Sequence, residues 1–218
     1  MSEPVIELCD VHFAYESGRV VFDALNFTIQ SGDRVGLTGA NGSGKTSLLH
    51  LIVGLVAPSS GEVRCFGTPR RGDADFNEVR RRVGLLFQDS DDQLFCPTVG
   101  EDIAFGPLNL GVSEREASAR VRASLDAVGL AGYEERITYK LSGGEKRLVA
   151  IATVLAMEPD VLLLDEPLTG LDEAHEQRVT EVLKSLSQTM LVVSHDRAFL
   201  SQVTSRQIKL ANGALSEN

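Results

Sequence analysis

The sequence lacks three features, and each absence excludes a class of protein. None of its apolar stretches approaches the roughly 20 residues that cross a bilayer, and residues 1–4 lack the basic and apolar regions of a secretory signal, so we expect a cytoplasmic location. A formal charge of −10 argues against a nucleic-acid partner, because proteins that bind phosphate backbones carry basic surfaces. Cys9, Cys65 and Cys96 are widely separated and have no C-x-x-C spacing, which predicts reduced thiols rather than a metal site.

The most informative segment that the chain does contain is a glycine-rich turn between an apolar strand and an apolar helix. Residues 39–46 satisfy G-x-x-x-x-G-K-[ST], in which backbone N–H groups and a helix N-terminus surround phosphates. The motif predicts that Lys45 reaches the β- and γ-phosphates of a nucleotide and that the Thr46 hydroxyl binds Mg²⁺. The alternative is an ordinary strand-turn-helix corner. The predicted nucleotide-binding residues are Gly39, Asn41, Gly42, Ser43, Gly44, Lys45, Thr46 and Ser47.

Two acids follow a second apolar run. Residues 161–164 are Val-Leu-Leu-Leu, which is typical of a parallel strand buried on both faces, and Asp165 and Glu166 come next. Acids buried there need a cation, so we expect Asp165 to hold Mg²⁺ and Glu166 to take a proton from the attacking water. Paired acids at a strand end can instead cap a helix, but the phosphate loop favours the metal.

Two further polar residues follow predicted strands. Gln88 comes after the apolar residues 83–87, and His195 comes shortly after residues 190–193. Ligands of open α/β sheets bind at the carboxyl ends of the strands, so we expect both side chains at the edge that carries Asp165. Gln88 could then coordinate the metal or orient a water, and His195 could hydrogen-bond a γ-phosphate. Each alone could also be an ordinary polar residue at a strand end.

Strands are predicted at both ends of the chain. Residues 5–13 and 25–29 indicate antiparallel strands ahead of the phosphate loop, and residues 207–213 indicate a closing hairpin. Tyr15 lies between the first two strands and could stack on adenine. The alternative is a tyrosine packed at the end of a strand.

From residue 89 to residue 158 the pattern becomes helical. Ser113 and Glu116 predict a capping box before a helix over residues 117–128. A second, buried helix over residues 147–157 follows Ser142 and two glycines, which predicts either a second anion site or a plain helix cap. Asp172 is expected to cap a later helix.

These motifs together resemble the ATP-binding cassette (ABC) proteins. Residues 39–46 look like the Walker A motif, Gln88 like the Q-loop, residues 141–145 like the signature, residues 161–166 like Walker B, residues 169–172 like the D-loop and His195 like the switch histidine. The resemblance implies an α/β P-loop NTPase fold: a RecA-like sheet and an antiparallel β subdomain (1–88 and 159–218) with an inserted helical subdomain (89–158).

The same resemblance implies the ligands and a partner. ATP and Mg²⁺ are the expected cofactors. Ser142 and Gly144 are expected to contact the γ-phosphate of ATP held by a second ATPase subunit, in a head-to-tail homodimer or a pair of paralogues. Gly143 and Asp172 complete the set of nucleotide-binding residues that the resemblance implies.

A narrower resemblance rests on residues 87–95 and 98–111, which include Asp-Asp-Gln-Leu-Phe and Phe-Gly-Pro-Leu-Asn-Leu-Gly. These look like the ATPase subunits of energy-coupling factor importers, although Ser90 stands where proline is usual and Leu148 where a basic residue is common. The resemblance implies an ATPase on the cytoplasmic face of the cell membrane, bound to transmembrane subunits that import cobalt, nickel or a vitamin such as biotin. The alternatives are a non-transport ABC ATPase, such as a translation factor or DNA-repair ATPase, and the detached ATPase of an exporter.

The segment behind this narrower resemblance is unusually apolar for a small helical lobe. Five of its residues exceed what the lobe is expected to bury, so some should form an exposed patch that binds a membrane partner. These residues are Leu94, Phe95, Ile103, Phe105 and Leu108. The alternative is that all five pack inside the lobe.

Overall fold

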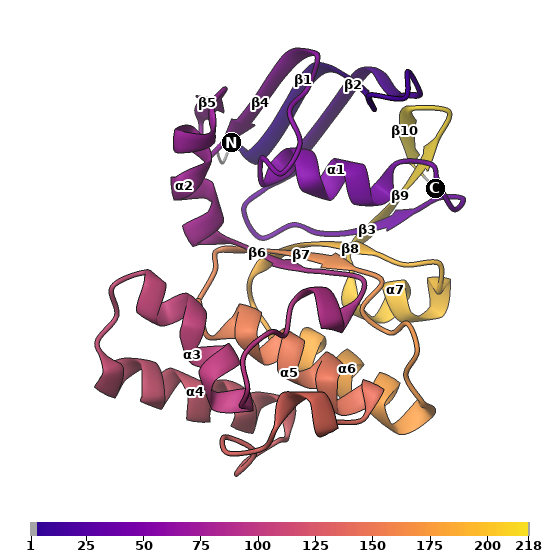
Figure 1. Cartoon of the computed structure of the whole chain (residues 1–218). Helices are drawn as coiled ribbons and strands as arrows, with labels where there is room; N and C mark the ends of the chain where they lie inside the picture. The colour runs from indigo at the N-terminus through magenta and orange to yellow at the C-terminus, as the bar shows by residue number, and fades with distance from the viewer. Residues whose placement is uncertain (1–3, 218) are drawn as a thin grey trace.

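The computed structural model describes residues 4–217 and contains two β-sheets. The smaller sheet is antiparallel, and its strand order is β2-β1-β4-β5. In Figure 1 it forms the upper layer, above helix α1. Its strands are β1 (Pro4–Ala14), β2 (Val20–Gln30), β4 (Ser60–Cys65) and β5 (Thr68–Arg70).

The larger sheet has the strand order β10-β9-β3-β8-β7-β6. All of its neighbouring strands run parallel except β10, which pairs antiparallel with β9 in the hairpin that the sequence predicts. The carboxyl ends of β3, β8, β7 and β6 therefore lie along one edge. The strands are β3 (Arg34–Thr38), β6 (Val83–Leu86), β7 (Val161–Asp165), β8 (Thr189–Val193), β9 (Arg206–Ala211) and β10 (Ala214–Glu217).

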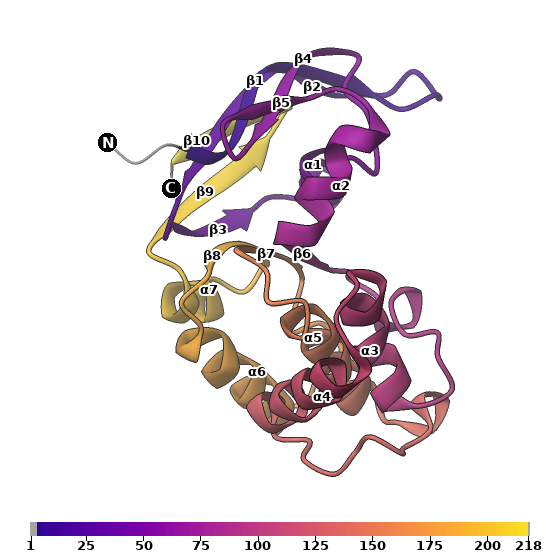
Figure 2. The ribbon, with the colours of Figure 1, turned by 90° about the vertical axis from the view of Figure 1, so that its left-hand side faces the viewer.

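Helices occupy both faces of the larger sheet. Helix α1 lies between the two sheets, and α3 to α7 cover the opposite face (Figures 1 and 2). The helices are α1 (Lys45–Ile52), α2 (Asp73–Arg82), α3 (Val99–Asn109), α4 (Glu114–Val128), α5 (Gly143–Leu155), α6 (Glu173–Ser185) and α7 (Arg197–Val203), with short 3₁₀ turns η1 (Ser90–Asp92) and η2 (Thr138–Lys140).

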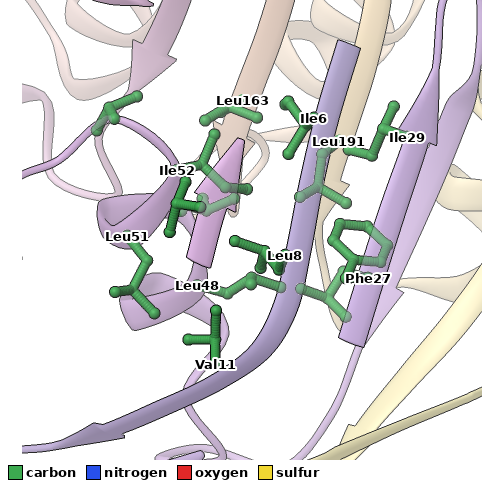
Figure 3. Packing of buried hydrophobic residues seen from close by; sticks show 14 of the residues in the cluster. Ile6, Leu8, Val11, Phe27, Ile29, Leu48, Leu51, Ile52, Leu163 and Leu191 are labelled. Carbon is green, nitrogen blue, oxygen red and sulfur yellow. The ribbon is translucent and has the colours of Figure 1, made fainter. Parts of the chain in front are cut away.

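Two apolar cores result from this layering. In the first, Ile6 and Leu8 of β1 pack on Leu48 and Ile52 of α1 (Figure 3). The second lies between the larger sheet and the helices beneath it. Strand β7 contributes to both, because its alternate side chains point to opposite faces: Val161 and Leu163 join the first core, and Leu162 and Leu164 join the second. The prediction of a strand buried on both faces is confirmed.

The structure departs from the sequence expectations at three helix starts. The basic segment 77–82 predicts a helix, and in the structure this helix, α2, begins at Asp73, because the Asp75 carboxylate accepts hydrogen bonds from the Arg71 and Gly72 amides, both at 3.0 Å. Helix α3 was not predicted as a separate element. At α4 only one bond of the expected capping box is present among the described residues, from the Glu116 amide to Ser113 Oγ at 3.3 Å.

Candidate functional site

The edge where the parallel strands end carries a cavity of about 750 Å³. The glycine-rich loop follows β3, Gln88 follows β6, Asp165 ends β7 with Glu166 directly after it, and His195 follows β8. The structure therefore brings these segments together, as the sequence predicts. Most of the predicted site residues line the cavity: Tyr15, Gly39, Asn41, Gly42, Gly44, Lys45, Thr46, Ser47, Gln88, Asp165, Glu166 and His195.

The glycine-rich loop has a conformation that side chains would prevent. A Cβ atom on Gly39 would lie 2.5 Å from the Leu210 carbonyl oxygen, and one on Gly44 would lie 2.5 Å from Val21 Cγ1. Gly44, with φ of 107°, is also the N-cap of α1. Lys45 is only 9% exposed, and its ammonium donates to the carbonyls of Gly39 at 3.0 Å and Ala40 at 3.2 Å. A buried cation and the start of a helix thus face the same cavity, which favours a phosphate ligand.

A hydroxyl and a carboxylate meet in the cavity where the resemblance implies a metal. Thr46 Oγ1 donates to Asp165 Oδ2 at 2.6 Å, and Asp165 is 3% exposed. The side chain of Gln88 lines the same cavity. A hydroxyl, a carboxylate and an amide are hard oxygen donors of the kind that Mg²⁺ prefers, so the residues fit this ion.

Glu166 is buried and its carboxylate is paired with a histidine. Its Oε2 atom lies 3.0 Å from Nδ1 of His195, whose side chain is largely exposed. The Glu166 backbone has φ of 46°, in the left-handed region that glycine favours, while its amide donates to Val193 O at 3.0 Å. Strain of this kind persists where the surrounding structure fixes the backbone, and it is concentrated at functional sites.

Tyr15 lies at the mouth of the cavity and is 45% exposed. Its hydroxyl and Ser47 Oγ are 2.7 Å apart, and its ring meets Phe13 edge-on at 5.1 Å. The ring is therefore held at the cavity while much of its surface remains accessible. This arrangement suits stacking on a planar base.

Five predicted residues lie outside this cavity. Ser43 lines a neighbouring hollow, and Gly143 lines another cavity, of about 640 Å³, together with Gln88 and Asp165. Ser142 caps α5, as predicted, and also forms a capping box with Glu145, which was not predicted. Gly144 packs on His175, because a Cβ atom there would lie 2.7 Å from the imidazole ring. Asp172 caps α6 and contacts His175 Nδ1 at 2.7 Å.

The apolar residues after Gln88 divide between the interior and the surface. The expectation that some of the five residues lie at the surface is confirmed, but Leu94, at 8% exposed, and Ile103, fully buried, are not among them. Phe95, Phe105 and Leu108 are 65%, 47% and 44% exposed, and the two aromatic rings meet edge-on with centroids 4.8 Å apart. We call these three residues the aromatic patch.

Three residues at the two cavities were missed by the sequence analysis. Arg19 lines the larger cavity and donates to the Gly42 carbonyl, and Thr169 lines both cavities. Arg147 is buried and donates to the backbone around Gln88 and Glu166. Nothing in the sequence around Arg19 distinguishes it from other surface cations.

The fold and the cavity define a P-loop nucleoside triphosphatase. Residues 22–169 match the ABC transporter family, and the chain belongs to that family. A Brucella suis protein named only as an ABC transporter ATP-binding protein is 48% identical over 98% of this chain and 88% of its own length. The energy-coupling factor transporter ATP-binding protein EcfA of Methanothermobacter thermautotrophicus is 43% identical over 97% of this chain and 69% of its own length.

Two solved structures have the same fold. The first is cbiO1 from Clostridium perfringens, part of the ABC transporter complex cbiONQ, with a TM-score of 0.87, 30% identity and coverage of 99% of this chain and 88% of cbiO1. The second is the ATP-binding cassette MJ0796, a dimer in a post-hydrolysis state bound to ADP and Pi, with a TM-score of 0.87, 27% identity and coverage of 97% and 98%. The protein is an ABC ATPase that binds and hydrolyses ATP. None of the helices within residues 4–217 has both the length and the apolar character to cross a membrane.

Proposed function

We propose that this ATPase powers an energy-coupling factor importer for cobalt, nickel or a vitamin such as biotin. It would work as a dimer with a second ATPase subunit, on the cytoplasmic face of the membrane beneath transmembrane subunits. The likeness to EcfA and to cbiO1 supports this assignment. The observation that carries it is the aromatic patch, which lies within the 20 residues that follow Gln88 and is too apolar to suit permanent contact with water.

Binding follows from the cavity. Lys45 and the amides of the glycine-rich loop receive the phosphates, and Tyr15 stacks on adenine. Thr46, Asp165 and Gln88 are the residues that would hold Mg²⁺, which neutralises charge on the β- and γ-phosphates when bound. The short contact between Thr46 and Asp165 already places two of these oxygen ligands together.

Hydrolysis requires a positioned water and a base. Glu166 accepts the proton of the water that attacks the γ-phosphate, and His195, 3.0 Å from the Glu166 carboxylate, orients that carboxylate and hydrogen-bonds the γ-phosphate. Gln88 orients the same water from the neighbouring strand end. Ser142, Gly143 and Gly144 lie outside this cavity and are proposed to serve the nucleotide of the partner subunit.

The aromatic patch is proposed as the contact with the transmembrane subunits. Phe95 and Phe105 border a hollow of about 210 Å³ that is also lined by Gln93 and Met157. Gln93 connects the patch to the nucleotide side, since its side-chain oxygen accepts from the Phe87 amide at 3.2 Å. A partner helix that binds the patch would therefore lie beside Gln93, whose side chain contacts Phe87, the residue before Gln88.

The first prediction tests this contact. Phe95→Asp places a charge on an exposed position, so the variant should fold and bind ATP but be released from membranes and lose import of the metal ion or vitamin. Val20→Asp is the matched control, because Val20 is 66% exposed against 65% for Phe95 and lies on β2, outside the patch. Sedimentation of membranes and uptake of labelled substrate measure the two effects.

Two outcomes would contradict the docking proposal. The first is that Phe95→Asp remains membrane-bound with normal uptake, and the second is that Val20→Asp is released to the same extent. Leu94→Asp is unsuitable for this test, because Leu94 is buried and its substitution would report on folding.

A further inference from the structure

Arg147 of helix α5 is among the largest fully buried side chains of the described residues and is 2% exposed. Its guanidinium donates five hydrogen bonds, and all five acceptors are backbone carbonyls. Nη1 donates to Phe87 at 2.5 Å and Gln88 at 3.3 Å, Nη2 donates to Asp165 and Glu166 at 2.8 Å each, and Nε donates to Pro167 at 3.0 Å. The five N–H groups of a guanidinium thus match five acceptors.

These acceptors belong to two segments that the site requires. Phe87 and Gln88 follow β6, and Asp165 to Pro167 end β7 and begin the turn after it. Arg147 itself lies in the second turn of α5, five residues after the cap Ser142. One planar side chain therefore joins the signature helix to the backbone that carries both the amide and the base of the ATP site.

The contact also accounts for the conformation of Glu166. A glutamate with φ of 46° is in a strained region of backbone space. Arg147 donates to the carbonyls of Glu166 and of both its neighbours in sequence, so it stabilises the orientation of these three peptides. If the guanidinium moves, the direction of the Glu166 side chain is expected to change with it.

The site needs this residue to remain a cation. Burial lowers the pKa of Arg147 to about 10, and the charges of Asp165, Asp89 and Glu166 act in the opposite direction. It stays protonated at neutral pH, with its charge compensated by carbonyl dipoles. The adjacent Leu148, in contrast, packs into the second apolar core.

We propose that Arg147 is a positioning residue through which the occupancy of the ATP site sets the position of the signature segment, residues 141–147, of the same chain. The inference rests on the proposed roles of Gln88, Glu166 and Ser142. It extends them because it assigns a connection within one subunit rather than a contact with nucleotide.

Arg147→Lys is the informative variant. Lysine keeps the charge but has three donors on one nitrogen atom. It therefore cannot donate at the same time to the carbonyls of residues 87–88 and to those of residues 165–167 in their present geometry. We expect unchanged affinity for ADP, which the loop of residues 39–46 binds, and a fall in kcat of about 100-fold, the cost of a reacting group misplaced by about 1 Å.

Arg34→Lys is the matched control. Arg34 begins β3, at the end of that strand opposite to the glycine-rich loop, and also donates to three carbonyls: Val203 at 2.7 Å, Leu186 at 2.7 Å and Leu183 at 2.6 Å. Burial lowers its pKa as well. Arg34→Lys should lower the melting temperature, because it also loses hydrogen bonds from a guanidinium to backbone carbonyls, but it should leave kcat unchanged.

Hydrogen exchange measures the connection directly. At a protein concentration where sedimentation shows only monomer, adenylyl imidodiphosphate should slow exchange in residues 39–46 and also change it in residues 141–147 of the wild type. In Arg147→Lys the first response should remain and the second should be lost. In Arg34→Lys both should remain.

Three results would overturn the proposal. The first is a wild-type monomer that responds at residues 39–46 but not at 141–147, which decides the matter even if Arg147→Lys does not fold. The second is that Arg147→Lys keeps wild-type kcat and both responses, and the third is that Arg34→Lys lowers kcat equally. Wild-type turnover in Glu166→Gln would instead contradict the proposed role of Glu166, and the exchange response would still test Arg147.

Discussion

Helices α1 and α5 both have a glycine at the N-terminus, as the cap of α1 and as the first residue of α5, but the surroundings of their first turns differ. Gly44 caps α1 and has no side chain that could accept from the first amides. Ser142 caps α5 and closes a capping box, in which the Glu145 amide donates to Ser142 Oγ at 3.2 Å and the Ser142 amide donates to Glu145 Oε2 at 2.8 Å. The start of α1 has no acidic side chain of its own, whereas the start of α5 contains an internal anion, Glu145, which pairs with the Ser142 amide.

The cavities differ in the same sense. The start of α1 opens into the cavity that also holds Asp165, Glu166 and His195, all from one chain. Ser142 and Gly144 do not line that cavity, and a Cβ atom on Gly143 would have no atom within 4 Å. One helix start is therefore part of a nearly complete site, whereas the other meets the separate cavity of about 640 Å³ at Gly143, where there is room for a further ligand. This is the geometry expected if the second serves a nucleotide held by a partner.

The largest expected effect separates binding from chemistry at the first site. Glu166→Gln keeps the size and hydrogen bonding of the side chain but removes the base, so kcat should fall about 10²–10⁴-fold while ATP still binds. Rapid-quench ATPase measurements and equilibrium binding of ATP give the two quantities. Glu173→Gln, an exposed substitution in the first turn of α6, is the control and should be silent.

Turnover at the wild-type rate in Glu166→Gln would show that Glu166 is not the base. Loss of ATP binding would show instead that the carboxylate holds the loop of residues 39–46 together. Binding at the start of α1 would then depend on Glu166, and the two functions could not be separated at this site.

The next prediction tests whether the start of α5 contacts the nucleotide that the partner subunit binds. Gly143→Asp places a negative charge in open space at the start of α5, where it would repel a γ-phosphate of the partner's nucleotide, so kcat should fall roughly 100-fold with ATP binding intact. Gly144→Asp would not distinguish repulsion from local damage, because its side chain would displace the ring of His175.

Mixing subunits decides between a shared site and a damaged helix. A dimer of Gly143→Asp with Lys45→Ala contains one site with an intact loop and an intact partner signature, so part of the ATPase activity should return. If mixed dimers form and no activity returns at any ratio, Ser142 and Gly143 do not serve the opposite subunit.

The sequence predicted the edge of the sheet well because each motif there lies within a few residues of an apolar strand. Parallel strands that end together bring Gln88, Asp165 and His195 to one cavity without further information. Helix α3 had a readable signal, since Thr98 and Glu101 form a capping box. Gly106 and Pro107 within the helix concealed it, because both residues disfavour helix interiors.

Burial on a scale of single residues could not be read from the sequence. Leu94 and Phe95 are neighbours with similar hydrophobicity, yet one packs into the second core and the other lies on the surface. Arg147 was missed for the opposite reason, because an arginine in an amphipathic helix is ordinarily expected at the surface. Its five acceptors come from segments about 20 and 60 residues away, and only the fold brings them together.

The smallest expected effect concerns the internal anion of α5. The Ser142 amide, and after it the Tyr133 hydroxyl at 2.8 Å, hold the pKa of Glu145 below its ordinary value of 4.5. The carboxylate therefore stabilises the folded state above that value, and the contribution is lost as the pH falls through the lowered pKa. Glu145→Gln should lower the free energy of unfolding by about 0.5 kcal/mol at neutral pH, with a difference that disappears in acid. Urea unfolding of the wild type and of Glu145→Gln across this pH range measures the difference in the free energy of unfolding. Tyr133→Phe is expected to lie between these two proteins. A constant difference at every pH would mean that the charge of Glu145 does not stabilise the start of α5.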